Sequence, residues 1–243
     1  MIDLTDRQIQ ILKVIIEEYI ETAEPVGSET LDKKYNLGVS PATLRNEMVS
    51  LTKKGFLKQP HTSAGRIPTS QGLKFYIHEL MKPKELSVAD EVAVKAKIWD
   101  FRYEYEKLLR EATRELARKT KTLALASTDE GDIFYAGAAN LLDMPEFFDI
   151  DLTKAMLSIL DQFDYLEQLL QRAMGEEEIH ILVGDELGNQ YLEPCGLVFT
   201  HFNPGKKHSG SIGVLGPSRL NYPFVIPTIR YFGDLIDEIA KNW

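Results

Sequence analysis

The sequence predicts an α+β protein built in three successive parts. About the first 80 residues combine short amphipathic helices with one hairpin. The stretch from Val88 to about Leu123 then contains neither proline nor glycine, which favours a long helix. Short β-type runs and helical runs alternate after it. We therefore expect an N-terminal domain over residues 1–81, a helical linker over residues 82–125 and a mixed α+β domain over residues 126–243.

Length and composition are those of an ordinary globular chain. Of its 243 residues, 44% are hydrophobic and 27% are charged, which excludes a wholly disordered chain and a collagen-like repeat. The single cysteine, Cys195, excludes an intrachain disulfide and a cysteine-rich zinc site. No apolar run reaches the roughly 18 residues of a membrane-spanning helix, and the first residues lack the pattern of a secretory signal. We expect a cytoplasmic protein that does not associate with membranes.

Two helices are predicted before residue 36. Thr5 and Gln8 have the spacing of a capping box, and apolar residues then recur every three or four positions. Pro25 and Gly27 interrupt this pattern. Ser28 is placed to cap a second, short helix.

The third helix has the clearest start signal of the chain. Ser40 is a serine N-cap, and Pro41 follows it at the first helical position. The apolar residues of this helix fall on one face, and Gly55 stands where a C′ glycine belongs.

A hairpin follows the third helix. Residues 56–60 read as a strand, residues 61–65 as a turn and residues 66–67 as a return strand, after which Pro68-Thr69 opens a fourth helix. Helix, helix, serine-capped helix and hairpin follow one another in the order of a winged helix-turn-helix.

The predicted linker helix is amphipathic, because apolar side chains recur in steps of three and four between Ile98 and Leu116. A helix of this length is expected to pack either on its own C-terminal domain or on a partner helix. In the C-terminal domain the pattern predicts strands at 133–135, 179–183, 196–202 and 211–215, and helices at 151–174 and 223–240.

Charge is distributed unevenly along this acidic chain of net charge −9. Residues 31–80 hold eight lysines and arginines against three acidic residues, a net charge of +5. Residues 1–30 carry −5 and residues 81–243 carry −9. A short basic block inside an acidic protein indicates a phosphate-binding surface. The alternative is a chance excess of lysines on a solvated face.

The third helix and the hairpin carry side chains suited to DNA. Arginine pairs with guanine and asparagine with adenine, and the first half of a recognition helix usually reaches the bases. We expect Arg45 and Asn46 to read bases, Lys53 to meet phosphates, and Arg66 to enter a minor groove or clamp a phosphate. The full set of candidate DNA-binding residues is Ser28, Ser40, Thr43, Arg45, Asn46, Ser50, Lys53, His61, Thr62, Ser63 and Arg66. Taken singly, each of these residues is better interpreted as an ordinary exposed polar side chain, which is also how we interpret Lys58 and Gln59. Taken together, on the helix order of a winged helix-turn-helix, they favour DNA binding.

Four segments carry a family resemblance. They are residues 40–48 (SPATLRNEM), 60–69 (PHTSAGRIPT), 135–142 (YAGAANLL) and 210–222 (GSIGVLGPSRLNY). In this order they resemble the bacterial heat-shock repressor family HrcA. The resemblance implies a dimeric repressor of chaperone operons that binds an inverted repeat called CIRCE and is supported by the GroE chaperonin. It also implies a winged helix, a GAF-like domain and a small inserted dimerising domain.

The middle of the chain departs from that family pattern. Only a few residues separate the predicted linker helix from Tyr135, so we expect the early GAF-like strands and the inserted domain to be missing or reduced. An operator with two-fold symmetry requires a protein with two-fold symmetry. We therefore expect the helix around residues 98–116 to supply the dimer contact.

Other function classes find less support in the sequence. Cys195, His201 and His208 offer zinc ligands in principle, but their spacing matches no metal motif, so we expect a buried thiol and exposed histidines. Residues 184–189 form a turn and lack the order of a phosphate-binding loop. We expect no catalytic residue, no cofactor, no metal and no enzyme activity. Two alternatives stay open, a regulator whose C-terminal domain binds a metabolite, and a chaperonin-binding protein without operator specificity.

Overall fold

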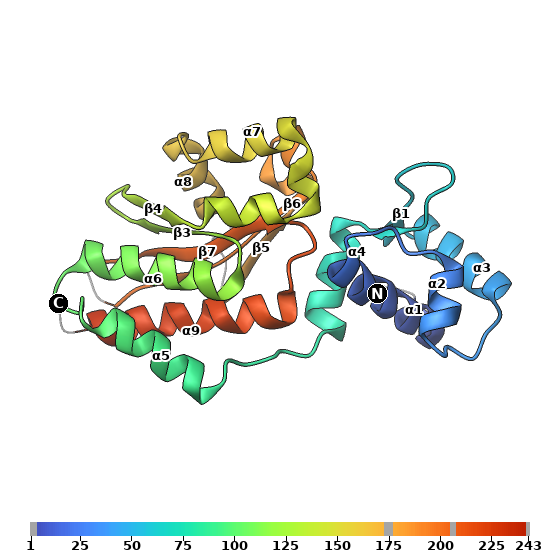
Figure 1. The fold of residues 1–243 in the computed structure, drawn as a ribbon, viewed down its shortest axis with the longest axis horizontal. Coiled ribbons are helices and arrows are strands. Elements are labelled where there is room, and N and C mark those ends of the chain that lie inside the picture. Colours follow the sequence, from blue (N-terminus) through green and yellow to red (C-terminus); the bar gives the residue numbers. More distant parts are fainter. Residues whose placement is uncertain (1–3, 173–176, 205–207, 242–243) are drawn as a thin grey trace. The chain divides into compact units, whose positions relative to one another are not determined.

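The computed structural model describes residues 4–172, 177–204 and 208–241, with the side chains of residues 171 and 172 left out. The chain forms two compact units, one up to Lys82 and one from Pro83 onward (Figure 1). Each unit has its own hydrophobic core.

The N-terminal unit consists of helices and one short hairpin. Its elements are α1 (Asp6–Thr22), α2 (Ser28–Lys34), α3 (Pro41–Lys53), the antiparallel strands β1 (Leu57–Lys58) and β2 (Ile67–Pro68), α4 (Ser70–Phe75) and a π-helical turn (Tyr76–Leu80). This order of elements agrees with the pattern of the sequence.

Local capping chemistry fixes the helix ends. The capping box between Thr5 and Gln8 is confirmed, and the Ser40 hydroxyl accepts a hydrogen bond from the Thr43 amide at 3.2 Å. Gly55 follows α3 with a φ of +84°, which favours glycine. The prediction that Ser28 caps α2 is wrong, because the cap is Gly27 and Ser28 is the first residue of the helix.

An ion pair with a buried carboxylate links α2 to α1. The Glu18 carboxylate is 7% exposed, lies 2.7 Å from the Lys34 ammonium and accepts a hydrogen bond from the Tyr35 hydroxyl at 2.5 Å. Burial alone would raise the pKa of Glu18, but these two partners outweigh burial and hold the pKa below its usual range. Lys34 therefore has a structural role, which is to hold α2 on α1.

The C-terminal unit is built on a five-stranded antiparallel sheet. Its strands are β3 (Leu123–Thr128), β4 (Ile133–Ala136), β5 (His180–Val183), β6 (Cys195–Phe202) and β7 (Gly210–Pro217), in the spatial order β4-β3-β7-β6-β5. The central pair β6 and β7 runs in register over eight residues, from Cys195 opposite Pro217 to Phe202 opposite Gly210.

Helices cover both faces of this sheet (Figure 1). One face carries α6 (Tyr105–Thr120) and α9 (Tyr222–Ala240), and α5 (Val88–Trp99) packs on them from outside. The other face carries α7 (Ile150–Ile159), α8 (Phe163–Arg172) and four 3-10 turns (Ala138–Asp143, Pro145–Phe148, Gly184–Leu187 and Gln190–Leu192). Leucine, phenylalanine and methionine side chains fill the space under α7 and α8.

The predicted continuous linker helix is wrong, because α5 ends at Trp99 and α6 begins at Tyr105. Aromatic residues crowd residues 99–105, and aromatic side chains lose rotamer freedom in a helix. The break allows α5 to fold back onto α6. The helix predicted over 151–174 is likewise two helices, α7 and α8, separated by residues 160–162, and positions 173 and 174 lie outside the described residues.

The sheet contains one strand, β3, that the sequence pattern does not predict. Strand β3, with the sequence LALAST, is rich in residues that favour helices, and the pattern assigned its start to the linker helix. It lies between β4 and β7 and every one of its residues is buried, as expected for a strand covered on both faces. Most of the apolar stripe from Ile98 to Leu116 is also buried within this unit, with Phe101 and Tyr105 half-buried, so α6 packs on its own sheet.

Glu115 makes the stability of the C-terminal unit depend on pH. Its side chain is 4% exposed, 2.7 Å from both Lys97 and Arg118, and these partners hold its pKa below the usual range although burial opposes them. A carboxylate with a depressed pKa stabilises the fold above its unfolded pKa, near 4.3, and that stability is lost as pH falls through the folded pKa.

Replacing this carboxylate should therefore flatten the pH profile. We expect Glu115→Gln to lower the free energy of unfolding by about 1–3 kcal/mol at pH 7. The difference from the unmodified chain should shrink as pH is lowered from 5 to 3, which urea unfolding at several pH values measures. A difference that stays constant down to pH 3 would show that the Glu115 charge is not what stabilises this contact.

Candidate nucleic-acid interface

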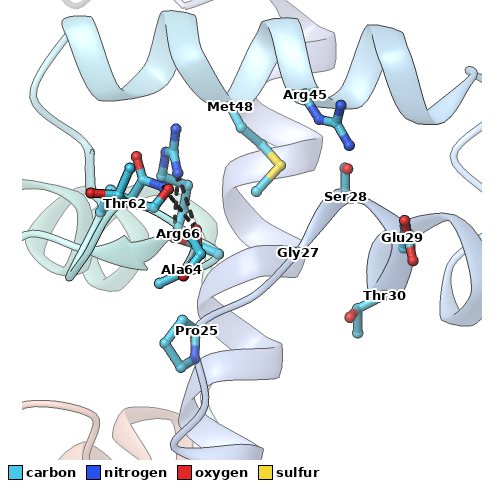
Figure 2. A pocket seen from close by; sticks show the side chains of 13 residues that line it. Pro25, Gly27, Ser28, Glu29, Thr30, Arg45, Met48, Thr62, Ala64 and Arg66 are labelled. Atoms are coloured by element: carbon cyan, nitrogen blue, oxygen red, sulfur yellow. Dashed lines mark hydrogen bonds between the residues drawn. The ribbon is translucent and has the colours of Figure 1, made fainter.

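A groove of about 520 Å³ lies within the N-terminal unit, between the start of α2, the middle of α3 and the hairpin turn (Figure 2). Candidate DNA-binding residues from three separate segments line it, namely Ser28, Arg45, Thr62, Ser63 and Arg66. The remaining lining residues are Pro25, Gly27, Glu29, Thr30, Met48, Gln59, Ala64 and Gly65. The fold thus brings together side chains that lie up to 38 positions apart in the sequence.

The solvent-facing side of α3 forms one wall of this region. Leu44, Met48 and Leu51 are buried, as the spacing predicts. The opposite side exposes five residues, which follow one another at steps of three or four positions apart from one adjacent pair, and we call these the α3 outer face. They are Ala42, Arg45, Asn46, Val49 and Lys53.

The sequence predicts three of these five residues, Arg45, Asn46 and Lys53, as DNA contacts. It does not single out Ala42 and Val49. Ala42 and Val49 are apolar, so a search for charged and amide side chains passes over them. Their signal is positional, because both lie on the helical face that Arg45 and Lys53 share. Small apolar side chains on a recognition helix can contact the methyl group of thymine.

Two residues predicted to contact DNA, Ser40 and Ser50, form hydrogen bonds that hold α3 in place. The Ser40 hydroxyl is occupied at the N-cap and lies 3.0 Å from the Thr43 hydroxyl. Ser50 is half-buried and accepts a hydrogen bond from the Gln8 side chain of α1 at 3.2 Å. These hydroxyls position α3, and Ser50 belongs to its inner side.

The Gln8 side chain of α1 holds α3 against α1. This side chain is 6% exposed, donates to Glu47 at 2.9 Å and accepts from Lys54 at 2.9 Å. A buried amide whose donor and acceptor are both satisfied specifies one arrangement of the two helices. The orientation of the α3 outer face is therefore fixed by the core.

The hairpin is tied to the segment that precedes α2. The backbones of Val26 and Arg66 exchange two hydrogen bonds, each of 2.9 Å. Gly65 makes this approach possible, because a Cβ there would lie 2.4 Å from the Val26 carbonyl oxygen. The two walls of the groove are thus held together through the main chain.

Side chains brace the hairpin turn as well. Arg66 is half-buried, and its Nε donates to the Thr52 hydroxyl of α3 at 3.1 Å, so this side chain joins the hairpin to the helix. Gln59, assigned to no binding role from the sequence, donates to the carbonyls of Thr62 and Ala64 at 2.9 and 3.0 Å. The turn residues His61, Thr62 and Ser63 are exposed.

The C-terminal unit separates the three residues considered as zinc ligands. Cys195 is fully buried, and burial raises the pKa of its thiol to about 12. His201 is exposed with its Nδ1 2.8 Å from the Ser211 hydroxyl, and the His208 ring packs against Tyr105. Among the residues that the structure describes, no three potential metal ligands gather, and no helix is both long and apolar enough to cross a membrane.

Comparison with known proteins identifies the family. The family model described as HrcA protein C terminal domain matches residues 50–226. The heat-inducible transcription repressor HrcA of Pelotomaculum thermopropionicum is 29% identical over 339 aligned positions, covering 98% of this chain and 97% of that protein. The protein of the same name from Desulforamulus reducens is 29% identical over 343 positions, covering 98% and 99%. A crystal structure titled as a hypothetical protein shares the fold with a TM-score of 0.79 at 23% identity, covering 99% of both chains.

The alignments also bear on the length of this chain. They extend over 339 and 343 positions, whereas this chain has 243 residues, so about a hundred positions of each alignment have no residue of this chain. The relatives therefore carry additional segments inside the matched region, as expected for a shortened member. Because the family model covers well over half of the residues, this chain belongs to the HrcA family.

Proposed function

We propose that this protein is a DNA-binding transcriptional repressor of heat-shock operons, with residues 1–81 acting as a winged-helix domain. The observation that carries the proposal is the α3 outer face beside the groove, where Arg45, Asn46 and Lys53 are exposed on a helix fixed by the core. Membership of a family whose relatives are named heat-inducible transcription repressors supports it.

In the proposed complex, α3 enters the major groove. Arg45 and Asn46, in the first half of the helix, read bases, while Lys53, near its end, meets a phosphate. The exposed turn residues His61, Thr62 and Ser63 contact the sugar-phosphate backbone of the DNA beside that groove. Arg66 keeps the turn in place through Thr52 and adds positive charge to the groove.

The C-terminal unit is proposed to be a GAF-like domain that regulates and dimerises the repressor. An antiparallel sheet with helices on both faces supports this reading. Apolar side chains fill the core between the sheet and α7, which favours regulation through the folded dimer. A cavity of about 450 Å³ beside α8, lined by Glu167, Leu170 and His201 among others, is the place where the alternative, a bound metabolite, would fit. Heat or shortage of a GroE-type chaperonin would lower the population of folded dimer, and operator binding would fall by mass action.

Transcription in vitro tests the repressor function. At a physiological salt concentration, the protein should block transcription from a promoter that carries a CIRCE-type inverted repeat. It should not block transcription from a promoter in which the repeat is scrambled. Added chaperonin should lower the protein concentration needed for repression. Equal transcription from both promoters at all protein concentrations would overturn the proposal and favour a chaperonin-binding protein without operator specificity.

A further inference from the structure

Two apolar side chains lie at the centre of the α3 outer face. Each residue of a helix is turned by about 100° from the residue before it. Ala42 and Val49 therefore point in directions that differ by about 20°, and both point away from Leu44 and Leu51, which are fully buried. Val49 is the larger of the two and is 37% exposed, so it is the apolar side chain that projects from this face.

The two residues expected to read bases lie on either side of Val49. On the same helical geometry, Arg45 is turned by about 40° to one side of Val49 and Asn46 by about 60° to the other. Both side chains can reach base edges in one groove only if the direction between them faces the floor of that groove. The orientation of α3 that the proposed function requires therefore directs Val49 at the bases.

The spacing of these residues is one with which a helix reads bases. The recognition helix of homeodomains uses four residues that follow one another at steps of three, one and three positions, and asparagine at the third of them pairs with adenine. Ala42, Arg45, Asn46 and Val49 follow one another at the same steps, and the third of them is Asn46. By this spacing the fourth residue, Val49, belongs to the set that contacts base edges.

The charges of α3 favour DNA over an apolar protein surface as the partner of Val49. Arg45 and Lys53 give the α3 outer face two positive charges. Glu47, the only acidic residue of α3, is turned to the flank, where it accepts a hydrogen bond from Gln8 at 2.9 Å and lies 3.8 Å from Arg7. An apolar centre bordered by positive charges and an amide fits the major groove, where phosphates border the base edges.

A valine at the floor of the major groove discriminates between bases. The 5-methyl group of thymine is an apolar feature of that groove, whereas the other base edges present hydrogen-bond donors and acceptors. Removing those polar groups from water without a new hydrogen-bond partner costs free energy, while burying a methyl group is favourable. Val49 therefore favours thymine at the base pair that it contacts.

We propose that Val49 is a specificity-determining residue and that it packs against the 5-methyl group of a thymine in each half-site of the operator. Along the helix, Val49 follows Asn46 by a rise of about 4.5 Å, which is close to the spacing of about 3.4 Å between base pairs. The thymine is therefore expected within about two base pairs of the adenine that Asn46 reads. The inference rests on the proposed function, because it requires α3 in the major groove.

A methyl-deletion scan of the operator tests this contact. Each thymine of one half-site of a CIRCE-type inverted repeat is replaced in turn by deoxyuridine, which pairs with adenine in the same way but lacks the 5-methyl group. The affinity of the full-length protein for each duplex is measured by fluorescence anisotropy. One deoxyuridine should weaken binding about fourfold, the effect expected for losing one buried methyl-sized group.

Val49→Ala removes the protein side of the same contact. This variant should bind the unmodified repeat several-fold more weakly, and should lose nothing further when the critical thymine becomes deoxyuridine. Alanine is a stronger helix former than valine, so this exposed substitution leaves α3 folded. Lys53→Ala is the matched control on the same face, and it should weaken binding to every duplex while keeping the loss of about fourfold at that thymine.

The outcomes separate the inference from the proposed function. The repeat can be bound more tightly than a scrambled duplex while no deoxyuridine weakens binding, or while Val49→Ala stays as sensitive to deoxyuridine as the unmodified protein. Either result would show that Val49 reads no thymine, and would overturn only the inference. Equal affinity for the repeat and the scrambled duplex would overturn the proposed function, and the inference with it.

Discussion

Replacing Arg45 with alanine is expected to weaken binding to the operator by about 5- to 150-fold, which corresponds to the loss of about 1–3 kcal/mol from one two-pronged contact with guanine. The side chain is exposed on the α3 outer face and lines the groove, so its removal leaves the core of the N-terminal unit unchanged. Discrimination at one base pair should relax at the same time, because the contact that distinguishes that pair is gone.

Two neighbouring variants show whether base reading is assigned correctly. Asn46→Ala should behave as Arg45→Ala does, at a different base pair. Lys53→Ala should weaken binding to operator and scrambled DNA alike and reduce the salt dependence by about one unit of slope. If all three variants lower the affinity equally on both DNAs, Arg45 and Asn46 are not the base readers.

Replacing Gly65 with alanine is the second change with a large expected effect. The added methyl would lie 2.4 Å from the Val26 carbonyl oxygen and 2.8 Å from the carbonyl carbon of Pro25, and neither backbone atom can rotate away as a side chain would. The hairpin must therefore separate from the segment before α2. We expect the free energy of unfolding of the N-terminal unit to fall by about 1–3 kcal/mol, and operator binding to be lost as the groove opens.

Gly27→Ala provides the matched control for this change. Gly27 also lines the groove, its φ is −93°, and a methyl there would meet only the Thr30 hydroxyl at an ordinary 3.9 Å. This variant should keep operator affinity and lose less than about 1 kcal/mol of stability, the cost of alanine at the N-cap of α2. Urea unfolding together with DNA titration separates the two glycines, and a Gly65→Ala protein that is as stable and as active as Gly27→Ala would show that the Val26–Arg66 pairing is dispensable.

Much of the N-terminal unit follows from local rules. The capping box at Thr5, the serine cap at Ser40 and the left-handed Gly55 are short-range signals, and each is in place. Helical spacing also predicts correctly that Arg45 and Asn46 face outward. These features depend on residues within one or two turns of the chain, so the sequence contains all the information they need.

Features that depend on distant partners were harder to predict. Ser50 looks like a surface hydroxyl until Gln8 of α1 is seen to bond it, and Arg66 looks unpaired until Thr52 of α3 is placed beside it. Strand β3 has the composition of a helix, and only helices on both faces of the sheet account for its apolar run. In each case a tertiary contact overrides or adds to the local preference.

The helix around residues 98–116, which the sequence predicts to supply the dimer contact, shows the same limit of prediction from local pattern. Periodicity between Ile98 and Leu116 predicts an apolar face, but it cannot say whether that face meets the chain's own sheet or another molecule. The structure buries it within the C-terminal unit and leaves a different apolar face, on α5, exposed.

A fluorescence-anisotropy titration tests the central proposal most directly. The full-length protein is titrated into a CIRCE-type inverted repeat and into a scrambled duplex of equal length, at two salt concentrations. Specific readout by the α3 outer face predicts that the repeat is bound at least about 10³-fold more tightly than the scramble. Equal affinities for both duplexes, each falling steeply with salt, would contradict the proposal, because they would show that only the positive charge of residues 31–80 attracts DNA.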